Sequence, residues 1–188
     1  STANILLSYW SIPLNELAKT SRGTILIGVF QPLFNFQLMK AWASNGFTVF
    51  SLDMIPRTTR AQSMDVLSSQ ANIAGYKAVL KAANLLPRYF PMFMTAAGSI
   101  PPAKLMVLGA GVAGLQAIAT ARRLGAVVSA YDVRPASADE VRSMGATFVE
   151  LELESLEGAG GYAREMTEDR AAKQRELLTP YIAKSHIV

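Results

Sequence analysis

Three glycines in the middle of the chain have the spacing of a turn that binds the phosphates of a dinucleotide. Gly109, Gly111 and Gly114 follow the apolar segment 104–108 and stand at the start of a helical pattern. In such a turn the first glycine permits a tight bend, the second lets the backbone approach a pyrophosphate, and the third lets the helix pack on the strand. Free N–H groups at the start of the helix then face the phosphates. The alternative is a tight strand-to-helix turn without a ligand.

An acidic residue at the end of the next predicted strand supports the binding interpretation. Asp132 follows Gly114 by 18 residues. A carboxylate in this position accepts hydrogen bonds from a ribose 2′-OH and repels a 2′-phosphate, so it favours NAD over NADP. Arg134 points the other way, because an arginine just beyond the strand can hold a 2′-phosphate. The alternative for Arg134 is a solvated surface charge.

A second polar cluster lies at residues 56–69, where a predicted loop runs into a predicted helix. It contains two arginines, a glutamine, an aspartate and serines, with Arg57, Gln62 and Asp65 among them. Such a junction can bring an amide, a carboxylate and a guanidinium to one edge of a cleft. The alternative is that Asp65 only caps the helix and that the arginines are solvated.

Short β-branched segments alternate with amphipathic ones, which predicts an α/β fold with βα units on parallel sheets. The predicted strands are 5–9, 24–30, 47–52, 104–108, 127–132 and 147–153, with another beginning at 186. The predicted helices are 13–19, 35–44, 65–86, 112–124, 137–144 and 167–184. The third helix has a predicted packing face formed by Leu67, Ala71, Ala74, Ala78, Ala82 and Leu85. We expect a loop at 53–60 and an irregular apolar stretch at 90–100.

The stiff Pro101-Pro102 joint is the predicted domain boundary. Residues 1–100 would form a partial N-terminal βα domain, which carries the loop 56–69 and the connecting helix 65–86. Residues 101–188 would form a partial NAD-binding Rossmann domain. The prediction is therefore two Rossmann-like domains with parallel sheets and the nucleotide in the cleft between them.

Composition excludes several classes of protein. Hydrophobic residues make up 51% of the 188 and charged residues 17%, so the chain can bury a core and is not intrinsically disordered. The chain has no cysteine and one histidine, which excludes a disulfide scaffold, a Cys nucleophile and a thiolate or His-rich metal site. We therefore expect no metal. The net charge of +4 comes from scattered residues, so we expect no nucleic-acid partner.

The polar cluster belongs to a longer series of motifs that resembles a known family. The segments are Arg-Thr-Thr-Arg-Ala-Gln-Ser-Met-Asp-Val-Leu-Ser-Ser at 57–69, Asn-Ile-Ala-Gly-Tyr-Lys-Ala at 72–78, Thr-Ala-Ala-Gly at 95–98 and Pro-Pro-Ala-Lys at 101–104. They closely resemble the NAD(H)-binding component (alpha subunit, domain I) of proton-translocating NAD(P) transhydrogenases. The match continues in order at 109–114, 132–134 and 160–163 and covers essentially the whole chain. A looser resemblance links the chain to alanine dehydrogenases.

The resemblance implies a role for individual residues. The family's mobile active-site loop corresponds to the polar cluster at 56–69, which would hold the nicotinamide end of the nucleotide. The catalytic residues of this loop would be Arg57, Gln62, Asp65 and Ser68, and Ser63 and Met64 would also contact the nucleotide. Gln62 would orient the dihydronicotinamide. Val112 would lie beneath the pyrophosphate, beside Gly109, Gly111 and Gly114. The adenosine ribose would be held by Asp132, Val133 and Arg134. Gly161 would lie in a loop beside the adenine, and Tyr162 would belong to a loop that closes over the bound nucleotide.

The resemblance also implies an activity: hydride transfer from NADH to NADP⁺ on a partner domain, coupled to proton translocation. Direct transfer between two nicotinamides needs positioning and no general base. We expect the single histidine, His186, to be structural. Alanine dehydrogenases carry a catalytic His in a Tyr-x-His-Leu segment, but residues 9–12 here read Tyr-Trp-Ser-Ile. That difference counts against the first alternative, an alanine-dehydrogenase-like oxidoreductase. The second alternative is a truncated nucleotide-binding module without turnover.

The same resemblance implies partners and a location. The partners would be an NADP(H)-binding domain, a proton-translocating membrane domain and a second copy of this component. The location would be the soluble face of a membrane complex, on the cytoplasmic side of a bacterial plasma membrane or the matrix side of the mitochondrial inner membrane. The family has strands before Ser1 and continues past Val188. We therefore expect a chain that is truncated at both ends.

Overall fold

The computed structural model describes residues 3–153 and 167–188, and the chain forms two compact units, Ser1–Ser69 and Gln70–Val188. The sequence predicts the division at Pro101-Pro102 instead. The structure divides the chain before Gln70 because the later part of helix α3 (Val66–Leu85) packs with the second unit, where Val79 belongs to the core. The predicted α/β fold with parallel sheets is confirmed in both units.

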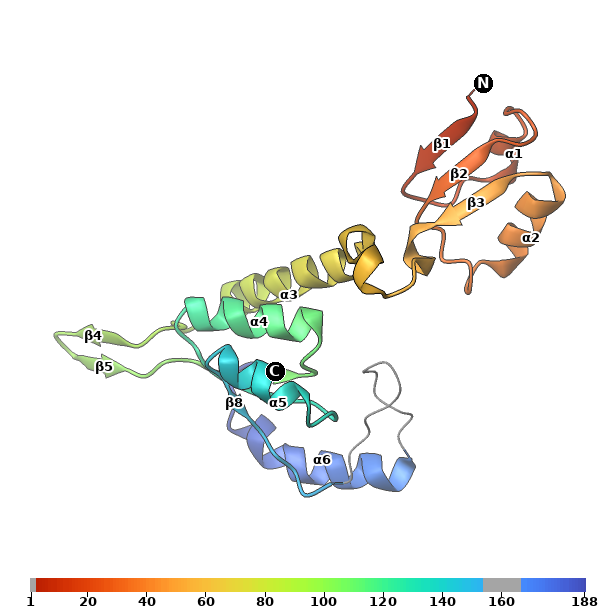
Figure 1. Cartoon of the computed structure of the whole chain (residues 1–188). Coiled ribbons are helices and arrows are strands. Elements are labelled where there is room, and N and C mark those ends of the chain that lie inside the picture. Colours follow the sequence, from red (N-terminus) through yellow and green to blue (C-terminus); the bar gives the residue numbers. More distant parts are fainter. Residues whose placement is uncertain (1–2, 154–166) are drawn as a thin grey trace. The chain divides into compact units, whose positions relative to one another are not determined.

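The first unit contains a three-stranded parallel sheet in the order β1-β2-β3 (Figure 1). Its elements are β1 (Ile5–Ser8), α1 (Leu14–Leu17), β2 (Ile25–Gly28), α2 (Phe36–Ser44), β3 (Thr48–Ser51) and the 3₁₀ helices η1 (Leu52–Met54) and η2 (Thr59–Met64). Leu26 of β2 packs with Leu17 of α1, Trp42 of α2 and Phe30. The rings of Phe30 and Trp42 meet edge to face with centroids 5.1 Å apart. The core of this unit therefore lies between the sheet and its two helices.

The opposite face of this sheet carries apolar side chains in solvent. Leu7 of β1 is 78% exposed and Phe50 of β3 is 57% exposed. Parallel sheets are normally covered on both faces, whereas here the packed helices α1 and α2 meet the face that carries Leu26. Within residues 3–69, the cover is therefore one-sided.

The second unit contains a parallel sheet in the order β6-β7-β8, which the chain end extends through a parallel bridge between Leu105 and Ile187. Its elements after α3 are β4 (Phe93–Thr95), β5 (Gly98–Ile100), β6 (Lys104–Leu108), α4 (Val112–Arg123), β7 (Val127–Tyr131), α5 (Ser137–Ser143), β8 (Thr147–Phe148) and α6 (Glu168–Ala183). The predicted strand that begins at 186 is therefore present as this bridge.

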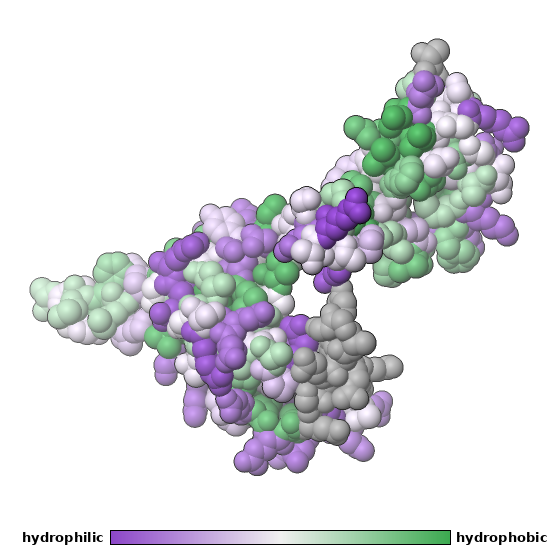
Figure 2. Space-filling view, viewed as in Figure 1, coloured by the Kyte–Doolittle hydropathy of each residue, from purple (hydrophilic) through white to green (hydrophobic). Residues whose placement is uncertain are grey.

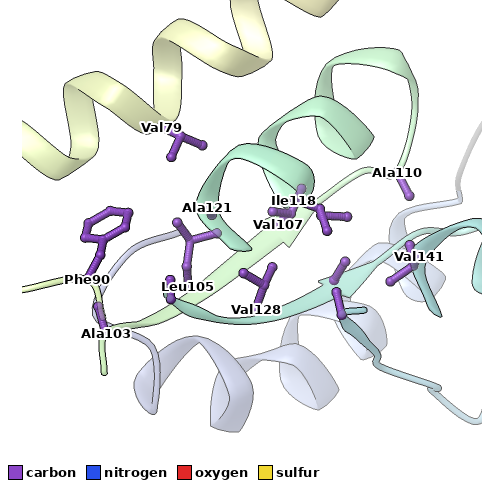
Figure 3. Packing of buried hydrophobic residues seen from close by; sticks show 13 residues of the cluster. Val79, Phe90, Ala103, Leu105, Val107, Ala110, Ile118, Ala121, Val128 and Val141 are labelled. Carbon is purple, nitrogen blue, oxygen red and sulfur yellow. The ribbon is translucent and has the colours of Figure 1, made fainter. Parts of the chain in front are cut away.

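Helices cover both faces of the second sheet. On one face, Val79 of α3 and Ile118 of α4 pack over Leu105 and Val128, as Figure 3 shows. On the other face, Leu178 of α6 packs with Met106 and other buried side chains. The uncharged stretch 105–121 is thus a buried strand that turns into a helix. Among residues 3–153 and 167–188, no helix combines the length and apolar character needed to cross a membrane.

The structure corrects the sequence prediction in the segment 90–100. Instead of an irregular stretch, it forms an antiparallel hairpin of β4 and β5. The turn is supported by the hydroxyl of Thr95, which donates to the carbonyl of Gly98 at 3.1 Å and accepts the N–H of Ala97 at 3.2 Å. Gly98 supplies the positive φ of +125° that the turn requires.

Three further predictions about elements were wrong in detail. The predicted strand 147–153 pairs only over Thr147–Phe148. Part of the predicted loop 53–60 and the residues after it form η1 and η2. The buried residues of α3 are Gly75 and Val79 rather than the predicted face, of which Leu85 is 70% exposed. The face differs because the neighbouring helix α4 meets α3 at Gly75.

Candidate functional site

The glycine turn between β6 and α4 has a different geometric requirement at each glycine. Gly109 has a φ of +98°, a conformation that side chains rarely adopt. A Cβ atom at Gly114 would lie 1.8 Å from the carbonyl oxygen of Gly109. At Gly111, by contrast, a Cβ atom would have no neighbour within 4 Å in residues 3–153 and 167–188. Two glycines therefore shape the turn itself, and the third keeps its outer surface bare.

Helix α4 begins directly after this turn. Its hydrogen-bond ladder starts where Leu115 N–H donates to the carbonyl of Gly111 at 2.8 Å, so the N–H groups of the preceding residues lie before the first bond of the ladder. Val112, the first residue of the helix, is 42% exposed. The helix therefore presents backbone donors and the positive end of its dipole beside the bare surface of Gly111.

Asp132 lies at the end of β7, directly beside this turn. Its Oδ2 accepts the N–H of Ala110 at 2.7 Å, and its side chain is 6% exposed. Arg134 binds the same carboxylate with Nε at 2.9 Å from Oδ1 and Nη2 at 2.9 Å from Oδ2. The backbone N–H of Arg134 also donates to Oδ1, at 2.9 Å. The sequence predicted both residues at the site but not the bond between them.

Burial and hydrogen bonding act on Asp132 in opposite directions. Burial raises the pKa of the carboxyl, but the hydrogen bonds from Arg134 and from the N–H of Ala110, with the charge of Arg134, outweigh it and hold the pKa below its ordinary value. Asp132 is therefore a carboxylate at neutral pH. It faces a cavity of about 390 Å³ whose walls also include Val133, Phe148 and Arg170.

The network at the rim of this cavity involves helix α6, which the sequence analysis did not single out. Oε1 of Gln174 accepts the hydroxyl of Tyr131 at 2.9 Å and Nη1 of Arg170 at 2.9 Å. Tyr131 and Gln174 are 43 residues apart, so no local pattern links them. Gly161 and Tyr162, predicted to contact the adenine end, lie outside the described residues.

The polar segment 56–69 brings three of its predicted residues to one cavity. Arg57, Gln62 and Asp65 line a cavity of about 270 Å³, and the buried residue Ala61 lines it too. Ser63 and Met64 lie on η2 and are exposed, outside that lining. The predicted clustering of an amide, a carboxylate and a guanidinium is therefore present in the first unit.

Asp65 also caps helix α3. Its Oδ1 accepts the N–H of Ser68 at 3.0 Å and its Oδ2 accepts the hydroxyl of Ser68 at 2.6 Å. These two bonds, together with the charge of Arg57, hold the pKa of Asp65 below its ordinary value. Ser68 thus contacts Asp65 rather than the cavity. Asp65 therefore caps the helix, as the alternative interpretation predicted, and its ionised carboxylate also lies beside Arg57 and Gln62.

A close crossing of α3 and α4 supports the glycine turn. A Cβ atom at Gly75 would lie 2.0 Å from the carbonyl oxygen of Ala113, in the first turn of α4. Nearby, Nδ2 of Asn72 donates to Oε1 of Gln116 at 3.1 Å. A glycine inside a long helix is a sequence signal for such a close contact.

His186 lies against the backbone of β6, consistent with a structural role. Its Nδ1 accepts the N–H of Lys104 at 2.8 Å, and its Nε2 lies 2.6 Å from Nη1 of Arg88. Desolvation and the charges of Arg88 and Lys104 lower the pKa of His186. The imidazole therefore stays neutral at physiological pH and links the chain end to the segment after α3.

Comparisons with known proteins agree with the predicted resemblance. Residues 2–74 match the N-terminal domain, and residues 78–188 the C-terminal domain, of the family described as alanine dehydrogenase/PNT. A Rickettsia prowazekii protein, named as the first part of NAD(P) transhydrogenase subunit alpha, is 48% identical over 175 residues, which are 93% of this chain and 46% of that protein. The protein of the same name from Rhodospirillum rubrum is 47% identical over 176 residues, which are 92% and 46%. The chain spans about half the length of these curated relatives.

Solved structures give the same result. The transhydrogenase from Sinorhizobium meliloti superimposes with a TM-score of 0.83 at 47% identity, over 97% of this chain and 49% of that chain. An L-alanine dehydrogenase superimposes with a TM-score of 0.64 at 19% identity, over 77% and 41%, and shares the fold. Two domain matches that together span nearly the whole chain, and relatives at almost half identity, lead to one conclusion: the chain belongs to the alanine dehydrogenase/PNT family.

Proposed function

We propose that this chain is the NAD(H)-binding part of a proton-translocating NAD(P) transhydrogenase, in which hydride passes from NADH to NADP⁺ on a partner domain. The observation that carries the proposal is the glycine turn, with Gly111 open to its outer side and Ala110 bound to Asp132. A bare backbone, a helix N-terminus and a carboxylate bonded to the same turn match the pyrophosphate and ribose of a dinucleotide. The names of the relatives support the transhydrogenase reaction.

Different residues of the chain would bind the nucleotide and orient its nicotinamide ring. Backbone N–H groups at Val112 and its neighbours would hold the pyrophosphate, and Asp132 would accept ribose hydroxyls. The bound dihydronicotinamide supplies the hydride. In the other unit, Gln62 would orient the nicotinamide ring, with Arg57 and Asp65 beside it in the same cavity. Positioning is what direct transfer between two nicotinamides requires, since no proton is abstracted from a substrate.

The partners of this component follow from the same proposal. The relatives are named as one part of an alpha subunit, which supports an NADP(H)-binding domain and a proton-translocating membrane domain supplied elsewhere. The chain would then work at the soluble face of a membrane complex, in the bacterial cytoplasm or the mitochondrial matrix.

We also propose that the component forms a homodimer. The hairpin β4–β5 and the segment before it expose Tyr89, Met92, Phe93 and Met94, with Met94 79% exposed, and Figure 2 shows apolar residues along the hairpin. Exposed apolar groups of this kind are typical of interfaces between proteins. Symmetric dimers are the commonest oligomers of soluble chains.

The first test is nucleotide affinity, measured by calorimetric titration of the chain with NADH and NADPH. Because Asp132 repels a 2′-phosphate, we expect NADH to bind at least tenfold more tightly, a difference of about 1.4 kcal/mol. Equal affinities would contradict the assignment of Asp132 to the ribose. Reduction of NAD⁺ that depends on alanine would support the alanine-dehydrogenase alternative instead.

The second test separates binding from hydride transfer. Gln62→Asn moves the amide back by one methylene, and a displacement of about 1 Å can lower a rate on the order of 100-fold. With the NADP(H)-binding and membrane domains supplied, we expect single-turnover hydride transfer to fall by about that factor while NADH affinity stays nearly unchanged. Loss of both together would indicate a structural role for Gln62, and full activity would exclude Gln62 from the site.

A further inference from the structure

The carboxylate of Asp132 has no acceptor position left for a ligand in this structure. A carboxylate offers about four lone-pair positions. Oδ1 accepts the backbone N–H and the Nε of Arg134, and Oδ2 accepts Nη2 of Arg134 and the N–H of Ala110. All four distances lie between 2.7 and 2.9 Å. A ribose hydroxyl that donates to Asp132 must therefore replace one of these donors.

Two of the four donors cannot easily leave. The N–H groups of Ala110 and Arg134 belong to the backbone of the glycine turn and of the residues after β7. The guanidinium of Arg134 lies at the end of a flexible side chain that is 24% exposed, whereas the carboxylate side chain is 6% exposed. The guanidinium is therefore the donor that a ribose hydroxyl can replace with the least change to the backbone.

We propose that Arg134 occupies the ribose-binding carboxylate in the free protein and must release it for the nucleotide to bind. This inference rests on the proposed function, because it assumes that Asp132 receives the ribose. Arg134 is then an internal competitor that lowers NADH affinity. It also sets specificity, since the released guanidinium can pair with a 2′-phosphate and so reduces the discrimination against NADPH.

The inference predicts opposite effects of Arg134 on the two nucleotides. In Arg134→Ala, both backbone donors to Asp132 remain and the competitor is gone. We expect NADH to bind about fivefold more tightly and the ratio of NADH to NADPH affinity to rise about tenfold. Arg134→Lys keeps the charge without the two-pronged contact, so we expect values between those of the wild type and of Arg134→Ala. Arg123→Ala removes an equal charge at the far end of α4 and serves as the matched control, with both affinities unchanged within twofold.

Titration calorimetry with NADH and NADPH on these variants tests the prediction, with melting curves to verify folding. A tenfold weaker NADH affinity in Arg134→Ala, or an unchanged ratio, would overturn it, because Arg134 would then hold the nucleotide directly or play no role. If the wild type binds neither nucleotide, the proposed function fails and the inference fails with it. If the wild type binds NADH but the affinities of Arg134→Ala do not change as predicted, the inference about Arg134 fails and the proposed function stands.

A second measurement needs no variant that could lose its fold. In the free wild type, the Nε–H of Arg134 is bonded to Asp132, so its ¹⁵N-edited NMR signal should exchange slowly with water. At saturation with 5′-AMP, which carries a free ribose 2′-OH, we expect this signal to shift and its exchange to accelerate at least tenfold. A signal that stays slow and unshifted at saturation would show that the guanidinium does not move.

Discussion

At the scale of single residues, three glycines that look equivalent in the sequence differ in what surrounds them. A Cβ atom at Gly114 would collide with the carbonyl of Gly109, whereas a Cβ atom at Gly111 would have no neighbour within 4 Å among the residues that the structure describes. The contact at Gly114 constrains folding, and we propose that the space at Gly111 receives a ligand. Mutations at the two positions should therefore separate stability from binding.

We propose Gly111 as the binding position. Gly111→Val places a branched side chain in the space assigned to the pyrophosphate, so we expect NADH affinity to fall at least 100-fold. The melting temperature should change by less than 2 °C, because the backbone at Gly111 has a negative φ of −82° that other residues adopt. Calorimetric titration and thermal denaturation measure the two effects. Normal NADH binding by this variant would place the pyrophosphate elsewhere.

The folding position is Gly114. Gly114→Ala forces a Cβ atom against the carbonyl of Gly109, and overpacking of this kind costs about 1–3 kcal/mol. For a chain of this size, each kcal/mol lowers the melting temperature by roughly 2–4 °C. Differential scanning calorimetry of Gly114→Ala beside Gly111→Ala provides the comparison. If the two variants melt together, the contact between α4 and the turn is looser than described.

At the scale of elements, the start of α3 depends on the side chain of Asp65. Its two bonds to Ser68 cap the helix. Asp65→Ala removes both, and loss of such a cap costs about 1 kcal/mol. Asp65→Asn keeps an acceptor but removes the charge, so it should retain most of the stability. Urea denaturation of the two variants measures the difference. Equal loss in both would mean that the charge, rather than the hydrogen bonds, stabilises the helix.

The sequence predicted most elements to within one or two residues, because hydrophobic periodicity and glycine or proline stops are local signals. It failed for features that depend on neighbours distant in the chain. The contact with α4 at Gly75 determines which face of α3 is buried. The length of the strand at Thr147 depends on how many of its residues pair with β7. The hairpin β4–β5 escaped prediction because the turn Thr95–Gly98 lacks an Asn-Gly or Asp-Gly pair.

In the candidate site, too, the sequence predicted local features but not contacts between side chains. The glycine turn, Asp132 and the cluster of Arg57, Gln62 and Asp65 were all predictable, because each is a short motif with a fixed spacing. The bidentate bond between Arg134 and Asp132 was not. The spacing of residues in the sequence does not fix the rotamer of an arginine side chain after a strand. The sequence therefore predicted the charged residues of the candidate site but not the pairing of Asp132 with Arg134.

At the scale of the whole molecule, the buried carboxylate of Asp132 makes stability depend on pH. Its pKa in the folded state lies below the ordinary value of 3.8, so its contribution is complete above the unfolded value and is lost as pH falls through the folded one. We expect the urea midpoint to decline steeply below about pH 4. Asp132→Asn should decline less over the same range. If the urea midpoints of the wild type and of Asp132→Asn decline equally with falling pH, other groups cause the loss of stability in acid.

Both tryptophans of the chain, Trp10 and Trp42, lie in the first unit. Tryptophan fluorescence, excited selectively, therefore reports on that unit alone. Trp42, buried against Phe30, should emit at short wavelength and resist acrylamide, whereas Trp10, 75% exposed, should emit at long wavelength and be quenched. Circular dichroism near 222 nm follows mainly α3, α4 and α6, most of which belongs to the second unit. Denaturation followed by both signals gives each half of the molecule its own optical probe without a label.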